Sequence, residues 1–184
     1  MPFFKQTTLA TLRLTLRWMS AGDAPALFNI FSDAAVTRYW SSGPWTDMAQ
    51  ARCAIDEILA SYENGKQLRF AIVLTATGEM IGSMNLYDFW HANRRCDVGY
   101  ALARAHWGMG YLTEAMQATM DYAFDTLELN RVEADVDPRN AASARLLEKM
   151  RFQKEGYMRE RWIVLGEVCD TVFYGLLRGD WEAD

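Results

Sequence analysis

Two closely spaced glycines, Gly108 and Gly110, stand directly ahead of an apolar stripe that begins at Leu112. Glycine lets the backbone approach a ligand closely and adopt positive φ angles. The first N–H groups of a helix lack intrahelical acceptors, and the helix dipole adds partial positive charge there. A glycine-containing loop that opens a helix therefore predicts an anion-binding site, and a pyrophosphate is a natural ligand for it.

Two familiar nucleotide-binding patterns do not fit this loop. The dinucleotide fingerprint G-x-G-x-x-G needs a third glycine where the chain has Thr113. The P-loop pattern G-x-x-x-x-G-K-[ST] occurs nowhere in the chain. The loop must therefore belong to another class of phosphate-binding protein.

Composition predicts one domain covering residues 1–184, because 51% of the residues are hydrophobic and can form a sizeable core. The net charge is −5 and no run of Lys or Arg occurs, which argues against a general nucleic-acid binder. No window approaches the ~18 consecutive apolar residues of a membrane span, and the first residues lack a signal-peptide pattern. We expect a cytoplasmic protein with neither nucleic acid nor membrane as a partner.

The three cysteines, Cys53, Cys96 and Cys169, form no C-x-x-C pair and no zinc-ligand spacing. No metal site is predicted, and buried free thiols are expected. A catalytic cysteine would need His91 or His106 as its partner, which the sequence alone leaves open.

Hydrophobic periodicity predicts a mixed series of helices and strands. Leucines alternate with polar residues over 12–17, and Ser20 with Asp23 then resembles a capping box at a helix start. A second helix is expected from Asp47 to Asn64, with Gly65 at its C′ position. Further strands are expected over 69–74, 80–89, 95–102, 131–136, 152–161 and 168–177, and further helices over 111–127 and up to Met150. This order indicates an α+β, or mixed α/β, domain.

The string W-G-x-G-Y-x-T-E-A from Trp107 to Ala115, after the strand end G-Y-x-L, resembles the GCN5-related N-acetyltransferase (GNAT) family. More narrowly, it resembles the branch that acetylates the N-terminal amine of ribosomal proteins. The stretch from Arg131 to Phe152 is similar to the family's strand, N-x-x-S helix and closing E-K-x-G-F, with Arg151 in place of the glycine. The opening T-L-R-L-T-L-R and the hairpin E-M-I-G-S-M-N-L extend the match to nearly the whole chain. The resemblance implies a central, mostly antiparallel twisted sheet of about seven strands flanked by about four helices.

The resemblance also implies that acetyl-CoA is the co-substrate and that no metal is used. The end of the preceding strand, at Leu102 and Ala103, would pair with the pantetheine arm, and a backbone N–H there would polarise the thioester carbonyl. Leu112 fills a slot that relatives give to a small residue, so we expect this chain to differ there. The residues expected to cradle the pyrophosphate with their backbone amides are Trp107, Gly108, Met109, Gly110, Tyr111 and Leu112.

Asn140 and Ser143 have two predicted roles. They can cap the helix that follows them, with Asn140 as N-cap. The resemblance implies that Asn140 also contacts the pantetheine and that Ser143 protonates the leaving thiolate. Many relatives use a tyrosine for that proton transfer, but Leu147 occupies its slot here.

The general base is predicted from the first strand of the final pair. Close relatives have a Glu in a slot that Trp162 fills here, and Glu160 lies two residues earlier. Residues two apart share a strand face, so Glu160 is the candidate, with Glu133 and Asp135 as alternatives. A strong base is not required for an α-amino group, because its pKa of about 7.7–8.0 leaves part of it neutral.

Aromatic residues before the second helix and after the third strand are expected to line the acceptor cleft. Trp40 and Trp90 are the candidates, together with Tyr39 and Trp45. The predicted function is transfer of an acetyl group from acetyl-CoA to a primary amine, preferably the N-terminal α-amine of a protein. A small amine (a polyamine, amino acid or aminoglycoside) as acceptor and a non-catalytic acyl-CoA-binding module are the alternatives. A homodimer is compatible with either.

Overall fold

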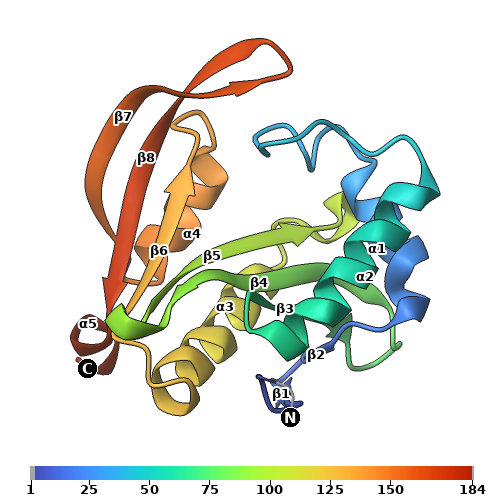
Figure 1. The fold of residues 1–184 in the computed structure, drawn as a ribbon, viewed down its shortest axis with the longest axis horizontal. Coiled ribbons are helices and arrows are strands. Elements are labelled where there is room, and N and C mark those ends of the chain that lie inside the picture. Colours follow the sequence, from blue (N-terminus) through green and yellow to red (C-terminus); the bar gives the residue numbers. More distant parts are fainter. Residues whose placement is uncertain (1–2, 184) are drawn as a thin grey trace.

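One sheet of eight strands runs through the computed structural model, which describes residues 3–183 (Figure 1). Its strand order is β1-β2-β3-β4-β5-β6-β8-β7, and every neighbouring pair is antiparallel except β5 and β6. The strands are β1 (Thr8–Ala10), β2 (Leu14–Trp18), β3 (Gln67–Leu74), β4 (Met80–Trp90), β5 (Arg95–Leu102), β6 (Arg131–Val136), β7 (Gln153–Val164) and β8 (Glu167–Leu177). The helices are α1 (Ala24–Phe31), α2 (Met48–Asn64), α3 (Tyr111–Asp121), α4 (Ala141–Lys149) and α5 (Arg178–Glu182).

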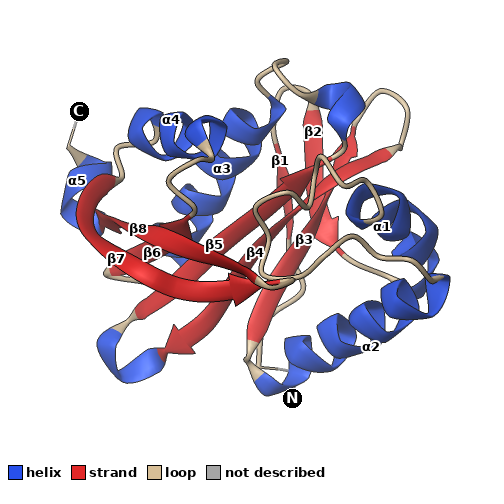
Figure 2. Cartoon of the chain, turned by 90° about the horizontal axis from the view of Figure 1, so that it is seen from above, coloured by secondary structure: helices blue, strands red, loops and turns tan. Residues whose placement is uncertain are grey.

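The predicted mixed fold with a mostly antiparallel sheet is confirmed. Seen from above, α3 and α4 lie on one side of the sheet and α1 and α2 on the other (Figure 2). The described residues hold one strand and one helix more than expected. The additional strand is the three-residue β1, and the additional helix is the five-residue α5. Both are too short to give a periodic pattern of their own.

The strand predicted from residue 12 begins later, at Leu14. Leu14 and Leu16 are buried on one face of β2, whereas Leu12 is 92% exposed. The amide of Thr11 donates to the carbonyl of Leu14 over 2.9 Å, which closes a turn between β1 and β2. Leu12 therefore lies on this turn, and the alternation of leucines runs past the true end of the strand.

Helix α2 has the predicted ends. The carboxylate of Asp47 accepts a hydrogen bond from the amide of Ala49 over 2.8 Å, so Asp47 is the N-cap. Gly65 follows the last helical residue with φ of +76°, which is the left-handed conformation that glycine adopts at low cost.

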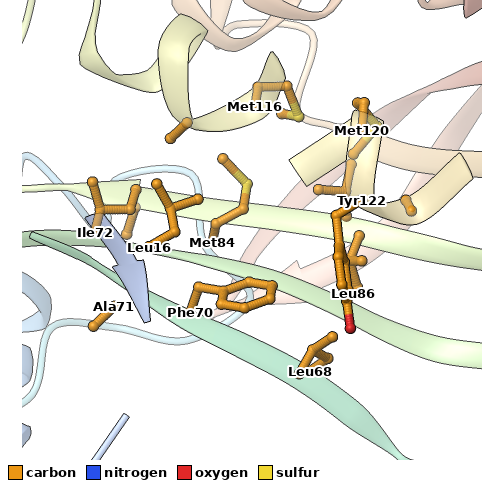
Figure 3. Packing of buried hydrophobic residues seen from close by; sticks show 14 of the residues in the cluster. Leu16, Leu68, Phe70, Ala71, Ile72, Met84, Leu86, Met116, Met120 and Tyr122 are labelled. Carbon is orange, nitrogen blue, oxygen red and sulfur yellow. The ribbon is translucent and has the colours of Figure 1, made fainter. Parts of the chain in front are cut away.

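The apolar stripe of α3 packs on the sheet as expected. Met116 and Met120 are buried and lie over Met84 of β4 (Figure 3). The α-helix predicted over 111–127 ends early, because residues Tyr122–Thr126 form a π-helical turn. The π-helical turn leaves the apolar stripe on the same face, so hydrophobic periodicity does not reveal the change of helix type.

The hairpin of β7 and β8 rises away from the rest of the sheet, and its tip approaches the segment between α1 and α2 (Figure 1). Arg38 of that segment contacts Glu167 over 3.3 Å. A Cβ on Gly43 would lie 3.0 Å from the side chain of Leu165, at the hairpin tip. The hairpin and this segment therefore meet above the middle of the sheet.

Two of the three cysteines are buried as predicted, namely Cys96 and Cys169. The expectation is wrong for Cys53, which is exposed because it lies on the outer face of α2. Within the described residues, no helix has the length and hydropathy needed to cross a membrane.

Candidate active site

The loop before α3 presents a row of backbone donors. Gly108 and Gly110 have φ angles of +75° and +79°, a left-handed conformation that costs other residues about 1–2 kcal/mol. Gly110 is also the N-cap of α3. Among residues 3–183, no protein acceptor binds the amides of residues 108–113. This arrangement, with a helix dipole behind it, can hold an anion such as a pyrophosphate.

Three side chains fix the shape of this loop. The indole N–H of Trp107 donates to the carbonyl of Leu102 over 2.8 Å, which ties the loop to the end of β5. Arg13 donates to the carbonyl of Met109 over 2.9 Å and to the carboxylate of Glu114 over 2.6 Å. Sequence reasoning missed Arg13 and Glu114, although Glu114 stands within the W-G-x-G-Y-x-T-E-A string.

Leu112 does not obstruct the loop. Its side chain is half-buried and packs against the core cluster on the sheet. A bulky residue in this slot therefore adds to the packing of α3 and leaves the row of amides accessible.

Strands β5 and β6 separate halfway along their length. Their parallel pairing ends at Asp97 and Glu133, although β5 continues to Leu102 and β6 continues to Val136. Figure 1 shows the two strands diverging from their common start. The second half of β5 therefore has one edge that faces no strand.

Backbone groups on this edge can pair with an extended ligand. The amide of Ala103 donates to the carbonyl of Ile81 on β4 over 2.8 Å. Because antiparallel ladders alternate, Tyr100 and Leu102 must direct their backbone groups away from β4. Among the described residues, the amide of Leu102 is therefore free on this edge and its carbonyl accepts the Trp107 indole N–H, whereas the amide of Ala103 is already used within the sheet.

Ser143 lies beside this open edge. Its hydroxyl oxygen is 2.6 Å from the hydroxyl oxygen of Tyr100, and its amide donates to the side chain of Asn140 over 3.1 Å. Asn140 is therefore the N-cap of α4, as predicted. Burial raises the pKa of Tyr100 to about 12, so its phenol is protonated at neutral pH. Leu147 is fully buried and does not reach this position.

A cleft of about 550 Å³ lies in front of Tyr100 and Ser143. Its walls are the diverging parts of β5 and β6, the start of α4, the segment between α1 and α2, and the β7–β8 hairpin. The hairpin tip meets the segment between α1 and α2, and this contact covers the cleft. The open edge of β5, the Tyr100–Ser143 pair and a substrate-sized cavity thus occur together.

Comparison with known proteins identifies this arrangement. A family model described as an acetyltransferase (GNAT) domain matches residues 13–153. The chain belongs to the GNAT family. The predicted resemblance is confirmed, and the protein is an acyltransferase that catalyses N-acetyl transfer.

Two curated relatives of this GNAT enzyme come from Bacillus species. The chain is 41% identical over 174 residues to the uncharacterized N-acetyltransferase p20 of Bacillus licheniformis, covering 95% of this chain and 98% of that protein. It is 35% identical over 107 residues to the "Putative ribosomal N-acetyltransferase YdaF" of Bacillus subtilis, covering 58% of each. A protein named as a putative ribosomal N-acetyltransferase is therefore among the relatives.

Solved GNAT structures share the fold. RimJ from Mycobacterium smegmatis in complex with CoA-disulfide has a TM-score of 0.85 at 24% identity and covers 97% of this chain and 91% of its own. Spermidine N-acetyltransferase from Vibrio cholerae in complex with CoA and spermine has a TM-score of 0.84 at 21% identity, covering 94% and 100%. At these identities the likeness concerns the fold alone, and the acceptor must be inferred from this chain's own residues.

The carboxylates of this GNAT enzyme differ in their access to the cleft. The structure does not bring Glu160 together with Ser143, because Glu160 is exposed on a bulge of β7 and does not line the cleft. Glu133 is engaged by Arg95 and Arg131 over 2.5 and 2.6 Å. No cluster of metal-ligating side chains occurs in residues 3–183.

Asp135 occupies the place in the cleft where relatives' Glu was expected. It lines the cavity and accepts a hydrogen bond from the indole N–H of Trp162 over 3.2 Å. Trp162 is the residue from which the sequence pattern placed the base two positions earlier, at Glu160. The carboxylate in this region therefore comes from Asp135 of β6, and Trp162 of β7 donates a hydrogen bond to it.

The aromatic residues predicted to line the acceptor cleft are divided. Tyr39 and Trp40 line it. Trp90 does not, since it is 57% exposed at the end of β4, where Arg95 lies 4.9 Å over its ring. Trp45 stacks on Phe31 with ring centroids 4.9 Å apart and packs against the core.

Proposed function

We propose that this enzyme transfers the acetyl group of acetyl-CoA to the N-terminal α-amine of a protein, by direct attack of the amine on the thioester. The observation that carries the proposal is the Tyr100–Ser143 hydrogen bond beside the unpaired edge of β5. A proton donor next to an unpaired stretch of strand, on which an extended thioester arm can lie, supports this reaction.

The residues present fit coenzyme A. The free amides of residues 108–113 match the charge of a pyrophosphate, and both φ-positive glycines keep this surface free of side chains. Tyr100 and Leu102 offer backbone groups to the amides of a pantetheine arm. Asn140 and Ser143 lie across the gap from them at the start of α4. When bound, acetyl-CoA supplies an activated acyl group.

Ser143 acts as the general acid in this proposal. As the nitrogen–carbon bond forms and the carbon–sulfur bond breaks, the Ser143 hydroxyl donates its proton to the leaving thiolate, and a proton from solvent restores the hydroxyl after the products leave. Tyr100 donates its own hydrogen bond to the Ser143 oxygen, which stabilises the charge that develops there. Burial keeps the Tyr100 phenol protonated for this task, since its pKa is about 12.

Asp135 takes the proton that the amine loses. It lines the cleft and is held by Trp162, whereas Glu160 faces solvent. An α-amine has a pKa of about 7.7–8.0, so part of it is already neutral near pH 7 and a strong base is not required. We therefore move the predicted base from Glu160 to Asp135.

A peptide acceptor is supported by the shape and surface of the cleft. The β7–β8 hairpin forms one wall of the cleft, and its residues Trp162, Ile163 and Leu165 are exposed by 42%, 75% and 83%. Exposed apolar side chains of this kind mark surfaces that bind other chains. A ribosomal-type relative at 35% identity is consistent with such an acceptor.

A thiol-release assay tests the proposal. Purified protein and acetyl-CoA are incubated with peptides that differ in their first residues, with matched peptides blocked at the N-terminus, and with small amines including spermidine. We expect thiol release with free but not blocked peptides, and a mass increase of one acetyl group at the peptide N-terminus. Turnover on small amines together with silence across all peptides would overturn the choice of acceptor.

A further inference from the structure

A second cavity, of about 660 Å³, adjoins the cleft on the face of the sheet that α2 covers. The two share Trp40, Ser41, Tyr87 and Gly99 as lining residues, so an acceptor can extend from one into the other. The inner wall of the second cavity is formed by polar residues of β3 and β4. These residues have no part in the acetyl-CoA site described above.

Arg69 on β3 lines this cavity and has no ionic partner. Its guanidinium makes no hydrogen bond and no ion pair within residues 3–183, and its Nε atom is enclosed without an acceptor. Burial lowers the pKa of Arg69 to about 10, so the group is still charged at neutral pH. The nearby groups that favour its charge, Tyr62 and Tyr87, are themselves uncharged phenols there.

Arg69 is half-buried with its Nε enclosed, and a charge so far removed from water without a partner is costly for the free enzyme. Buried ions are normally paired, because protein contacts must replace the water that burial removes. The other charged residues of the cavity, Glu57, Lys66 and Asp88, are exposed to solvent. Arg69 is thus the charge that a ligand within the cavity would meet, and an anion would complete its hydrogen bonds.

Asn85 on β4 gives a second unfilled group in the same wall. Its side chain is 7% exposed and its Nδ2 donates to Gln67 over 3.1 Å, but its Oδ1 has no donor. A buried acceptor without a partner is uncommon in folded proteins. A ligand that offers an N–H group beside an oxyanion would satisfy Asn85 and Arg69 together.

The strand register aligns these groups with the reaction centre. Arg69 is opposite Asn85, and Asn85 is opposite Gly99 on β5. Neighbouring strands are about 4.8 Å apart, so the Cα atoms of Arg69 and Gly99 are separated by about 10 Å. Gly99 lies next to Tyr100 on the edge proposed to hold the thioester. A short acceptor can therefore reach both Arg69 and the edge of β5 beside Tyr100.

Opposite charges lie at the two ends of the row of paired residues that runs from Arg69 on β3 through Asn85 to β5. Carboxylates gather on the β5–β6 side, where Asp97 and Asp135 act together with Asp88 to raise the pKa of Tyr87, after burial as the main cause. Arg69 lowers it from the β3 side. An amine is favoured near the carboxylates and an anion is favoured near Arg69.

We infer that Arg69 and Asn85 form a subsite for a carboxylate carried by the acceptor, so the enzyme selects amines that bear an acidic group close to the reacting nitrogen. This inference rests on the proposed acetyl transfer at the Tyr100–Ser143 site. The carboxylate can come from an acidic side chain near a protein N-terminus or from the α-carboxylate of a free amino acid. Polyamines, which carry cations in its place, are disfavoured.

Paired acceptors test the inference. The rate of thiol release is compared for peptides with Asp or Asn at the second position, for free amino acids and their amides, and for spermidine. We expect kcat/KM at least tenfold higher for the carboxylate member of the peptide pair, of the amino-acid pair, or of both. Which pair shows the preference identifies the source of the carboxylate.

Variants connect the preference to Arg69. R69Q should abolish the preference for the carboxylate member by raising its KM, while the kinetic constants for the amide member stay the same. The variant should unfold at a temperature no lower than that of wild type. R69K should retain part of the preference. The matched control is R52Q, which removes an exposed arginine from the outer face of α2 and should change neither acceptor.

Several outcomes would overturn the inference. They are equal rates for both members of every pair, a preference for spermidine, or an R69Q defect of equal size on both members. If no amine releases thiol, the proposed acetyl transfer is wrong. The carboxylate subsite is then tested separately, by calorimetry with CoA and each acceptor pair. The subsite is upheld if wild type binds the carboxylate member at least tenfold more tightly than the amide member and R69Q loses this difference. Equal binding of the two members by wild type would refute it.

Discussion

The hydroxyl oxygen of Tyr100 on β5 lies 2.6 Å from the hydroxyl oxygen of Ser143 on α4, across the gap where β5 and β6 part. In the proposed mechanism, Ser143 is the residue that protonates the leaving thiolate. We expect Ser143→Ala to lower kcat by about 100-fold, the lower end of the range for loss of a general acid. The affinity for CoA, measured by calorimetry, should stay within about threefold, since one hydrogen bond to the bound ligand is worth about 1 kcal/mol or less.

Tyr100→Phe should act through Ser143 and produce a smaller defect. Loss of one hydrogen bond to a group that becomes charged corresponds to at least about 1.5 kcal/mol, so we expect kcat to fall by roughly 10-fold. Tyr174→Phe is the matched control, because Tyr174 also contacts α4, through Glu148 over 3.4 Å, but does not line the cleft. Equal losses in both variants would show that packing against α4 matters and that the Tyr100 hydroxyl does not.

Asp135→Asn separates the two candidates for the base. The amide oxygen can still accept the Trp162 hydrogen bond but cannot take a proton, so we expect kcat/KM at pH 7 to fall by about 10- to 100-fold. The defect should shrink as the pH is raised to about 9, because an α-amine with a pKa of about 7.7–8.0 is then neutral without help. Glu160→Gln should stay within about twofold of wild type. The reverse pattern would return the role to Glu160.

Gly110→Ala tests the loop that is proposed to hold the pyrophosphate. The new Cβ would lie 3.5 Å from Arg13, an ordinary contact, so the cost comes from the φ of +79°. We expect the free energy of unfolding to fall by about 1–2 kcal/mol and the CoA dissociation constant to rise at least tenfold. Gly78→Ala places the same change at φ of +75° in the β3–β4 turn. It should lose similar stability and keep CoA affinity; equal CoA binding in both variants would contradict the assignment of the loop.

The sequence predicted the parts of the site that depend on local pattern. Gly110 opens α3 and Asn140 caps α4 because turn and capping chemistry are properties of a few neighbouring residues. The string that carried the family resemblance also contains Tyr100 in its G-Y-x-L segment. Alternation along β5 would have directed attention to Tyr100, since its neighbours Gly99 and Ala101 face the other side of the sheet.

Other parts of the site depend on contacts that local pattern does not encode. Glu160 was placed beside Trp162 by the rule that residues two apart share a strand face. The register of β7 shifts between Met158 and Trp162, and Glu160 has a φ of +52°, so the rule fails there. Arg69 gave no signal either, because a lone arginine in an alternating strand usually faces solvent, and only the covering helix α2 makes it buried.

Asp97 predicts how stability depends on pH. Burial raises the pKa of this carboxyl from 3.8 to about 7, helped by Glu133, Asp88 and Asp135 and opposed by Arg95. The folded state therefore binds the Asp97 proton more tightly than the unfolded state. Its contribution to stability is fully present below about pH 4 and is lost as the pH rises through about 7.

Asp97→Asn removes the carboxyl that loses this proton. The variant should be more stable than wild type at pH 8, by about 1–3 kcal/mol once the shift is discounted for partial exposure to water, and similar to wild type near pH 4. Chemical denaturation at both pH values measures the difference. Asp56→Asn is a suitable control, because Asp56 is exposed on α2 and its replacement should leave the pH dependence unchanged. A wild-type protein whose stability does not fall between pH 4 and pH 8 relative to Asp97→Asn would contradict the raised pKa, because the group would then titrate as it does in the unfolded chain.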